Sequence, residues 1–190
     1  MREEKLIFQY ETLKSQVNPH FLFNSLNTLS SLVATDGQLS EQFINKLSSI
    51  YRYILENRDI DLINLSKEIG FVNDYFFLQK IRDNGKIDLI IDVKKTENYE
   101  ILPISIQLLV ENALKHNSAT REKPLAIKIY QESENLIVEN ALQPKMHLEP
   151  SSKTGLKNLS ERVKLVLNKE VQIESGNGIY KVKIPVKQIQ

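Results

Sequence analysis

The residues that could do chemistry gather first around His20, within Asn18-Pro19-His20-Phe21-Leu22-Phe23-Asn24. A neutral imidazole near pH 7 is a nucleophile that can accept a group and pass it on. Pro19 should kink or bulge a helix just before His20, because proline removes a backbone hydrogen bond and clashes with the preceding turn. Asn24 follows one helical turn later, on the same face. A lone helical histidine is more often structural, but these neighbours in this order favour a reactive one.

A second group of chemical residues lies between Gln107 and Asn117, a stretch that is apolar at first and polar at its end. On a helix, Asn112, Lys115 and His116 fall on or near one face. An amide oxygen there can ligate Mg²⁺ while the two basic side chains reach phosphates. The structural alternative is an apolar helix that simply ends in polar residues.

A third group precedes the last predicted helix, at Lys153-Thr154-Gly155-Leu156-Lys157-Asn158. The backbone N–H groups of Gly155 and Leu156 would open that helix, and a helix N-terminus favours phosphate. A glycine before a helix is weak evidence alone. Its position after the polar helix end at Asn112 makes the pair more informative.

The composition limits the class of protein. The chain has 190 residues, of which 41% are hydrophobic and 26% charged, with a formal net charge of +1. These values fit a folded soluble chain of one or two domains, and they argue against direct nucleic-acid binding. The absence of cysteine excludes disulfides and thiolate metal sites, and fits a reducing compartment. The charged N-terminus is followed by neither a signal peptide nor a membrane span.

The first part of the chain predicts helices. Apolar residues recur at helical spacing from Leu6 to Val33 and again from Phe43 to Leu55, with turn chemistry at residues 34–38. Two antiparallel helices cannot bury both of their apolar stripes alone, so we expect a homodimer with a four-helix bundle. A third helix is predicted from a serine N-cap at Ser66 to Arg82. Residues 1–84 are predicted to form this helical domain.

The second part predicts an α+β layer over residues 85–190, a mixed sheet covered by helices. The patterns predict a helix from Pro103 to His116, a long loop from Glu139 to Lys153 and a helix from Gly155 to Leu167. The predicted strands cover residues 87–93, 125–131, 135–138, 171–174 and 179–184, and the last two form a hairpin around Gly176-Asn177-Gly178.

The segment around His20 resembles the phosphoacceptor motif of LytS-type sensor histidine kinases, Asn-Pro-His-Phe-Leu-Phe-Asn, continued here by Ser25-Leu26-Asn27. The resemblance implies that His20 takes the γ-phosphoryl group of ATP and passes it to an aspartate of a response regulator. It also implies that Asn24 stands where an amide positions water for dephosphorylating that partner. Other histidine kinases tend to carry an acidic residue directly after the histidine, where this chain has Phe21.

The segment around Asn112 resembles the N-box of the GHKL ATPase superfamily, shared by histidine kinases, type II topoisomerases and Hsp90-like chaperones. The resemblance implies a two-layer α/β sandwich of the Bergerat type, with Asn112 as the Mg²⁺ ligand and Lys115 and His116 at the ATP phosphates. In this family an Asp-x-Gly-x-Gly loop binds adenine, and Asn140 falls at the place of its aspartate without the loop's glycines. The later glycine box survives as Gly155, Leu156 and Asn158, with Lys153 replacing its first glycine.

The resemblance extends from about Glu11 to Pro185. It implies a homodimeric, ATP- and Mg²⁺-dependent protein histidine kinase whose partner is a response regulator, with the LytTR type as one option. It further implies a cytoplasmic domain of an inner-membrane sensor, joined to the membrane through an input region before Met1. The alternative is a non-catalytic pseudokinase dimer, or a regulator phosphatase, with a degenerate ATP pocket. The segment from Asn140 to Lys153 discriminates between them.

Overall fold

The computed structural model describes residues 19–145 and 154–189. The chain divides into two compact units, Met1–Arg58 and Asp59–Gln190, so the division differs from the one predicted at residue 84. The reason is helix α4 (Leu65–Arg82), which contacts β2, β3 and α5 of the second unit rather than extending the first. No helix within the described residues is both long and apolar enough to cross a bilayer.

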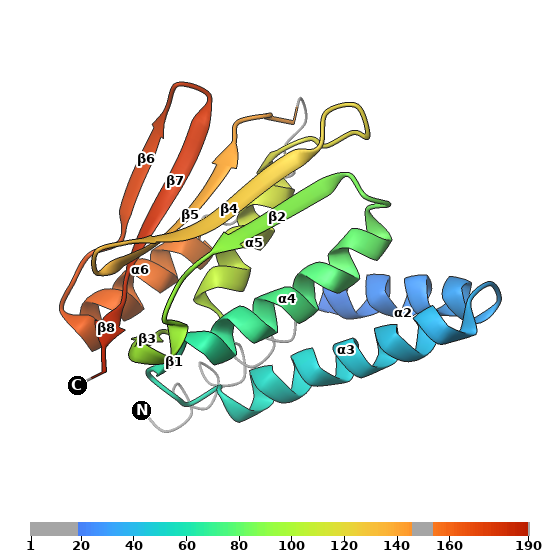
Figure 1. The fold of residues 1–190 in the computed structure, drawn as a ribbon, viewed down its shortest axis with the longest axis horizontal. Helices are drawn as coiled ribbons and strands as arrows, with labels where there is room; N and C mark the ends of the chain where they lie inside the picture. The colour runs from blue at the N-terminus through green and yellow to red at the C-terminus, as the bar shows by residue number, and fades with distance from the viewer. Residues whose placement is uncertain (1–18, 146–153, 190) are drawn as a thin grey trace. The chain divides into compact units, whose positions relative to one another are not determined.

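The first unit contains the predicted helical hairpin, made of α2 (Pro19–Val33) and α3 (Gly37–Glu56) (Figure 1). Asp36 caps α3, because its carboxylate accepts a hydrogen bond of 2.9 Å from the backbone N–H of Leu39. The turn lies where turn chemistry predicts it. The predicted kink before His20 involves residues that precede Pro19, and these lie outside the described residues, as does the earlier part of the predicted first helix.

The hairpin has one buried and one exposed set of apolar side chains. Helix α3 buries Phe43, Leu47, Ile50 and Ile54, which recur at intervals of three or four residues. The Phe21 ring on α2 lies 6.5 Å from the Tyr51 ring on α3. Other large apolar side chains stay exposed, above all Phe23 at 66%, Val33 at 63% and Leu55 at 60%. The hairpin therefore carries apolar surface that its own described residues do not cover.

The second unit is built on a five-stranded mixed sheet of order β2-β4-β5-β7-β6. Strands β2 and β4 are parallel, and every other neighbouring pair is antiparallel. The strands are β2 (Ile87–Asp92), β4 (Leu125–Glu132), β5 (Asn135–Ala141), β6 (Gln172–Gly176) and β7 (Ile179–Pro185). Strands β6 and β7 form the predicted hairpin, and Asn177 and Gly178 in its turn both have positive φ, as a type I′ turn requires.

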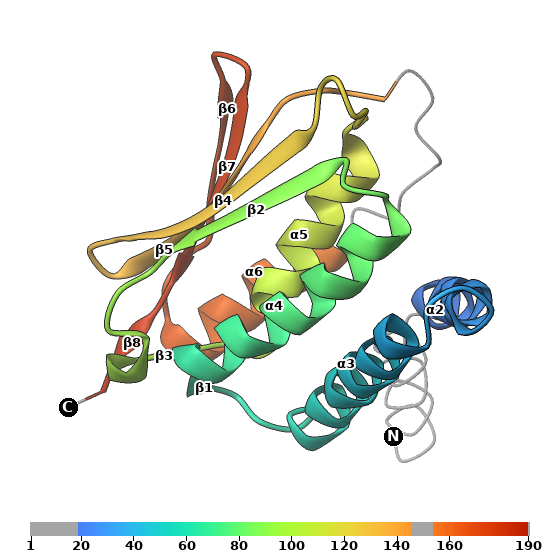
Figure 2. The same ribbon diagram turned by 45° about the vertical axis from the view of Figure 1, so that its right-hand side comes forward.

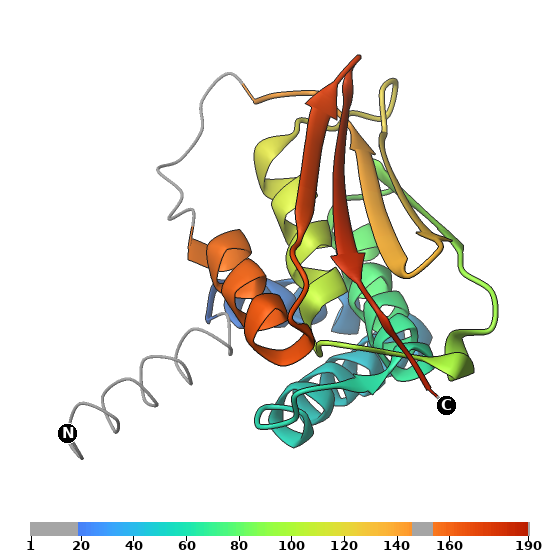
Figure 3. The same cartoon turned by 90° about the vertical axis from the view of Figure 1, so that its left-hand side faces the viewer.

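Helices α4, α5 (Ser105–His116) and α6 (Thr154–Leu167) lie on one face of this sheet (Figures 2 and 3). The arrangement is the predicted α+β architecture of two layers. Alternate strand residues face the helices and are fully or almost fully buried, namely Ile127, Ile129, Leu136, Val138, Val182 and Ile184. The helices contribute Val72, Leu78, Ile106, Val110 and Val163 to the same core.

A small second sheet joins the two ends of this unit and was not predicted. It has the order β1-β3-β8, from β1 (Ile63–Asn64), β3 (Tyr99–Ile101) and β8 (Lys187–Gln188). A short 3₁₀ helix, η1 (Thr96–Asn98), precedes β3. Strands of two or three residues are too short for alternation to appear in a sequence.

Two local predictions need correction. The cap of α4 is Asn64 rather than Ser66, because the Asn64 side chain accepts a hydrogen bond from the backbone N–H of Ser66. The predicted loop from Glu139 begins later, since β5 continues to Ala141 while paired with β7. Asn140 is therefore a strand residue.

Candidate functional site

Helix α5 carries Asn112, Lys115 and His116 on its more accessible side. Its opposite side buries Ile106, Leu109, Val110 and Ala113 against the sheet. Asn112 and His116 are half-buried and Lys115 is exposed. Because they are spaced by three and four residues, the three polar side chains lie along the end of one helical face.

The start of α6 lies beside α5. A methyl group placed on Gly155 would meet the Leu108 side chain of α5 at 3.5 Å, one turn before Asn112. Gly155 and Leu156 are half-buried, whereas Asn158 is exposed. The first turn of a helix has N–H groups without intrahelical partners and a partial positive charge. An anion could therefore be bound between this turn and Asn112.

Asn140 lies near the end of β5, on the face of the sheet that the helices cover. Its neighbours in register are Ile127 of β4 and Tyr180 of β7. Asn140 is only 4% exposed, and its amide Nδ2 donates a hydrogen bond of 2.8 Å to the Ala141 carbonyl. The amide oxygen is the part of Asn140 that can accept a hydrogen bond from a ligand.

The segment after β5 is fastened to the C-terminal end of α5, a feature that sequence reasoning missed. The buried Asn117 Oδ1 accepts a hydrogen bond of 2.7 Å from the Gln143 backbone N–H, and Asn117 Nδ2 donates to the Ala113 carbonyl at 2.9 Å. Asn117 and Pro144 also form an isolated β-bridge. Asn117 thus links the helix of Asn112 to the strand of Asn140. The sequence shows only a polar side chain at a helix end, which does not identify its partner Gln143.

His116 has a distinct electrostatic environment. Partial burial lowers its pKa below the usual 6.5, and the nearby positive charges of Lys115 and Lys145 lower that pKa further. Lys145 is held there, because its backbone N–H donates to the His116 carbonyl at 3.2 Å and its Nζ donates to the Leu114 carbonyl at 3.0 Å. His116 is therefore neutral at pH 7 in the free protein.

This depressed pKa predicts a pH dependence for nucleotide binding. A phosphate beside His116 would favour the protonated imidazole, so binding takes up a proton and affinity rises several-fold as the pH falls from 7.5 to 6. The stability of the nucleotide-free protein depends on pH in the opposite direction to the affinity. The free energy of unfolding decreases as the pH falls below 6.5, because the unfolded chain binds a proton at His116 more readily than the folded chain does.

Calorimetry of Mg-ADP binding in buffers of different ionisation enthalpy measures this proton uptake. The matched control is His116→Gln, which keeps a polar side chain without titration. We expect the variant to lose most of the pH dependence that the parent chain has. An equal proton uptake in both chains would remove His116 from the phosphate site.

His20 and Asn24 meet on α2 in the first unit. Asn24 Nδ2 lies 3.2 Å from both Nδ1 and Nε2 of His20. A position equidistant from both ring nitrogens lies over the face of the imidazole, because a hydrogen bond in the ring plane would be close to one nitrogen only. Pro19 and His20 are exposed. Asn24 thus leaves the in-plane direction of each ring nitrogen open.

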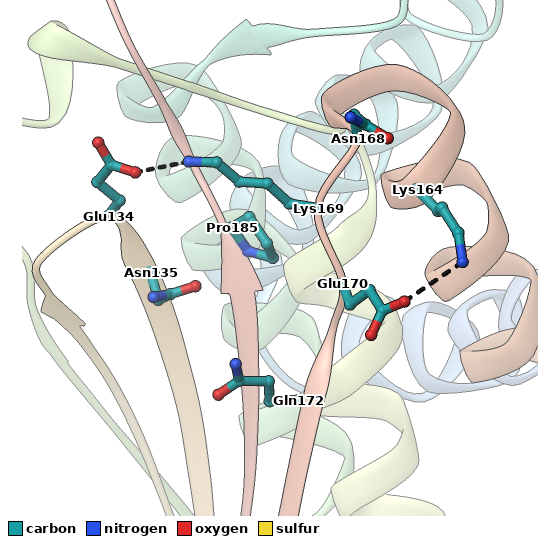
Figure 4. Close-up of a pocket in the computed structure, with 8 residues that line it drawn as sticks. All are labelled: Glu134, Asn135, Lys164, Asn168, Lys169, Glu170, Gln172 and Pro185. Atoms are coloured by element: carbon teal, nitrogen blue, oxygen red, sulfur yellow. Dashed lines mark hydrogen bonds and ion pairs between the residues drawn. The ribbon is translucent and has the colours of Figure 1, made fainter.

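A hollow of about 510 Å³ lies elsewhere in the second unit (Figure 4). Its lining residues lie at the start of β5 and the end of α6. The predicted site residues Asn140 and Gly155 lie at the opposite ends of these elements, at the end of β5 and the start of α6. Two ion pairs border it, Lys169–Glu134 at 2.6 Å and Lys164–Glu170 at 3.3 Å. The hollow contains none of the predicted site residues, so substitutions of its polar residues are suitable controls for substitutions at the predicted site.

These features together define a class of protein. A helical hairpin with an exposed histidine, followed by an α+β unit, is the arrangement that the resemblance to histidine kinases implies. The family model for histidine kinases matches residues 8–87. The chain is 33% identical over 184 residues to the sensor histidine kinase/phosphatase LytS of Staphylococcus aureus strain MRSA252, and 44% identical over 110 residues to the sensor protein LytS of Bacillus subtilis strain 168. The chain belongs to the LytS-type sensor histidine kinases.

The chain spans only part of those relatives. The Staphylococcus alignment covers 87% of this chain and 32% of the relative. The Bacillus alignment covers 57% of this chain and 18% of the relative. Among solved structures, the catalytic domain of the histidine kinase ThkA aligns at 20% identity with a TM-score of 0.46, over 65% of this chain and 94% of that chain.

Proposed function

We propose that this chain transfers the γ-phosphoryl group of ATP to His20 and then to an aspartate of a response regulator. The observation that carries the proposal is α5, where Asn112, Lys115 and His116 share an accessible side next to the first turn of α6. The names of the relatives support the same activity, because one is described as a sensor histidine kinase/phosphatase.

The proposed transfer balances as a simple displacement. A ring nitrogen of neutral His20 attacks the γ-phosphorus, a new N–P bond forms, and the bond between that phosphorus and the β,γ-bridging oxygen breaks. ADP leaves with that oxygen, and the ring loses its N–H proton to solvent or a base. The second transfer breaks the N–P bond and forms an acyl phosphate on the regulator's aspartate.

The residues of the second unit fit a magnesium-bound nucleotide. Mg²⁺ is usually held by one or two protein oxygens together with substrate phosphates and water, and Asn112 can supply such an oxygen. The described residues contain no cluster of three or more His, Cys, Asp or Glu. Phosphate and water oxygens would therefore complete the coordination of an ion held by Asn112. The ion would neutralise phosphate charge, while Lys115, His116 and the first turn of α6 hold and orient the phosphates.

The test is incubation of the purified chain with Mg²⁺ and γ-labelled ATP. We expect label on the protein that is lost in acid and stable in alkali, as a phosphoramidate is. Absence of label from a folded, dimeric chain that binds ATP would overturn the kinase proposal and favour the pseudokinase alternative.

A substitution at Asn140 tests where adenine binds. A carboxylate accepts a stronger hydrogen bond from the adenine amino group than an amide does, so Asn140→Asp should bind Mg-ADP about 10-fold more tightly. The variant should also be less stable without nucleotide, because it loses the hydrogen bond donated to Ala141. Titration with ADP and GDP measures the effect, and Asn135→Asp in the distant hollow is the control. Unchanged or weaker ADP affinity would move adenine away from β5.

A phosphatase activity toward the same regulator is the second candidate. Asn24 favours it, because an amide beside His20 can hydrogen-bond a water near the regulator's acyl phosphate. Such an activity requires neither His20 as acceptor nor ATP hydrolysis. It therefore coexists with the kinase reaction in one chain.

We further propose that the chain works as a homodimer and in the cytoplasm, where ATP is present. The exposed apolar side chains of the hairpin, including Phe23, Val33 and Leu55, support pairing with a second hairpin into a four-helix bundle. The regulator is proposed as the partner of His20, and the LytTR type remains one option. We propose that α4, which the sequence placed with residues 1–84, works with the nucleotide-binding unit, because it packs on that unit.

A further inference from the structure

The backbone is strained immediately before α5. Ile104, the residue before the helix, has φ of +67°, in the left-handed region that β-branched residues rarely adopt. Its side chain makes no capping hydrogen bond, although its carbonyl accepts the bond of 3.1 Å from Leu108 N–H that begins the helix. Such strain persists only where surrounding groups hold the backbone in place.

Glu68 of α4 is the group that holds it. Its carboxylate accepts one hydrogen bond from the backbone N–H of Ile104 at 3.0 Å and another from Ile106 at 3.1 Å. Glu68 is 0% exposed, which is rare for a carboxylate, and its partners lie 36 and 38 residues further along the chain. The buried side chain therefore acts as the N-cap that α5 lacks locally.

The charge of Glu68 suits this position. Glu68 lies in the first turn of α4 and binds the first turn of α5, so the positive ends of two helix dipoles meet at one carboxylate. A glutamine would retain the size but offer one acceptor atom where two N–H groups need one each. An aspartate would retain the charge with a shorter reach.

Helix α4 also meets α5 near its other end, close to Asn112. Tyr75 of α4 is almost fully buried and accepts a hydrogen bond from Gln79 Nε2. Burial raises the pKa of Tyr75, and the carboxylate of Glu111, the residue before Asn112, raises that pKa further. Helix α4 is thus close to α5 in two places, at the start of α5 and near Asn112.

We propose that Glu68 is a positioning residue for the nucleotide site, which fixes the start of α5 and thereby the place of Asn112. The inference rests on the proposed function, because it assigns Asn112 to the magnesium-bound phosphates. An α-helix transmits a shift of its first turn along its axis, and productive binding geometry tolerates displacements of only about 0.5–1 Å. A role limited to stability would leave the geometry around bound nucleotide unchanged.

The test compares ADP affinity with Mg²⁺ and with EDTA, under conditions where each variant is folded. Magnesium should strengthen binding by the parent chain. In Glu68→Gln the affinity with Mg²⁺ should fall about 10-fold or more, whereas affinity in EDTA should change little, because the Asn140 region is not displaced. The control is Ile129→Val, a buried change in β4 that lowers stability but leaves both hydrogen bonds of Glu68 in place.

The outcomes separate the two proposals. A parent chain that binds no nucleotide would overturn the proposed function itself. A parent chain with magnesium-dependent binding, together with a folded Glu68→Gln variant of equal magnesium dependence, would overturn only the role of Glu68. If Glu68→Gln does not fold, Glu68→Asp is tested by the same ratio of ADP affinity in Mg²⁺ to ADP affinity in EDTA. Aspartate should retain part of the magnesium effect, and a ratio equal to the parent's would contradict the proposal.

Discussion

Replacing His20 with glutamine is expected to reduce phosphoryl label on the chain to background while leaving its affinity for Mg-ATP unchanged. Glutamine has no nitrogen that can form a stable phosphoramidate, so the acceptor is removed rather than weakened. His20 lies in the first unit, and the predicted nucleotide residues lie in the second. Labelling rate and nucleotide affinity, measured on the same preparation, separate the two functions.

The sequence offers two matched controls for this substitution, because it contains three histidines. His147→Gln should label like the parent chain. His116→Gln should label more slowly in proportion to its weaker phosphate binding. Full labelling of the His20 variant would mean that another residue accepts the group, and the assignment of α2 as the phosphoacceptor helix would fail.

Replacing Asn112 with alanine is expected to lower the labelling rate by about 100-fold or more, the usual effect of losing one preorganised contact to transferring charge. The lost group is the proposed oxygen ligand of Mg²⁺, so affinity for Mg-ADP should fall as well. Asn112 is half-buried on the accessible side of α5, and alanine is a good helix former there. Stability should therefore change little.

Asn135→Ala is the control for Asn112→Ala. Asn135 also belongs to the second unit but lines the hollow at the start of β5. Thermal unfolding, ADP titration and labelling should all match the parent chain. Equal losses in both variants would show a general effect on folding, and no loss in Asn112→Ala would exclude Asn112 as the ligand.

Elements with a strong local pattern were predictable. The hairpin of α2 and α3, the helix over Leu65–Arg82 and the hairpin of β6 and β7 follow from apolar spacing and turn residues. The end of β5 was not predictable, because Asn140 and Ala141 have little strand propensity. Their strand conformation comes from pairing with Tyr180 and Ile179 of β7, a contact between distant segments.

The candidate site divides in the same way. Asn112, Lys115 and His116 lie within one short segment of a predicted helix, so helix geometry alone predicts that they share a face. Glu68 and Asn117 could not be selected, because their roles depend on partners 26 to 38 residues away. The backbone strain at Ile104 could not be predicted from the sequence either, because a β-branched residue rarely adopts a positive φ.

Mass-spectrometric mapping tests most directly whether His20 accepts the phosphoryl group. The chain is incubated with Mg-ATP and digested near neutral pH, which preserves phosphoramidates. We expect one modified histidine, in the peptide containing Asn18-Pro19-His20, and none in the peptides containing His116 and His147. Phosphate on another residue, or an unmodified His20 in a chain that consumes ATP, would contradict it.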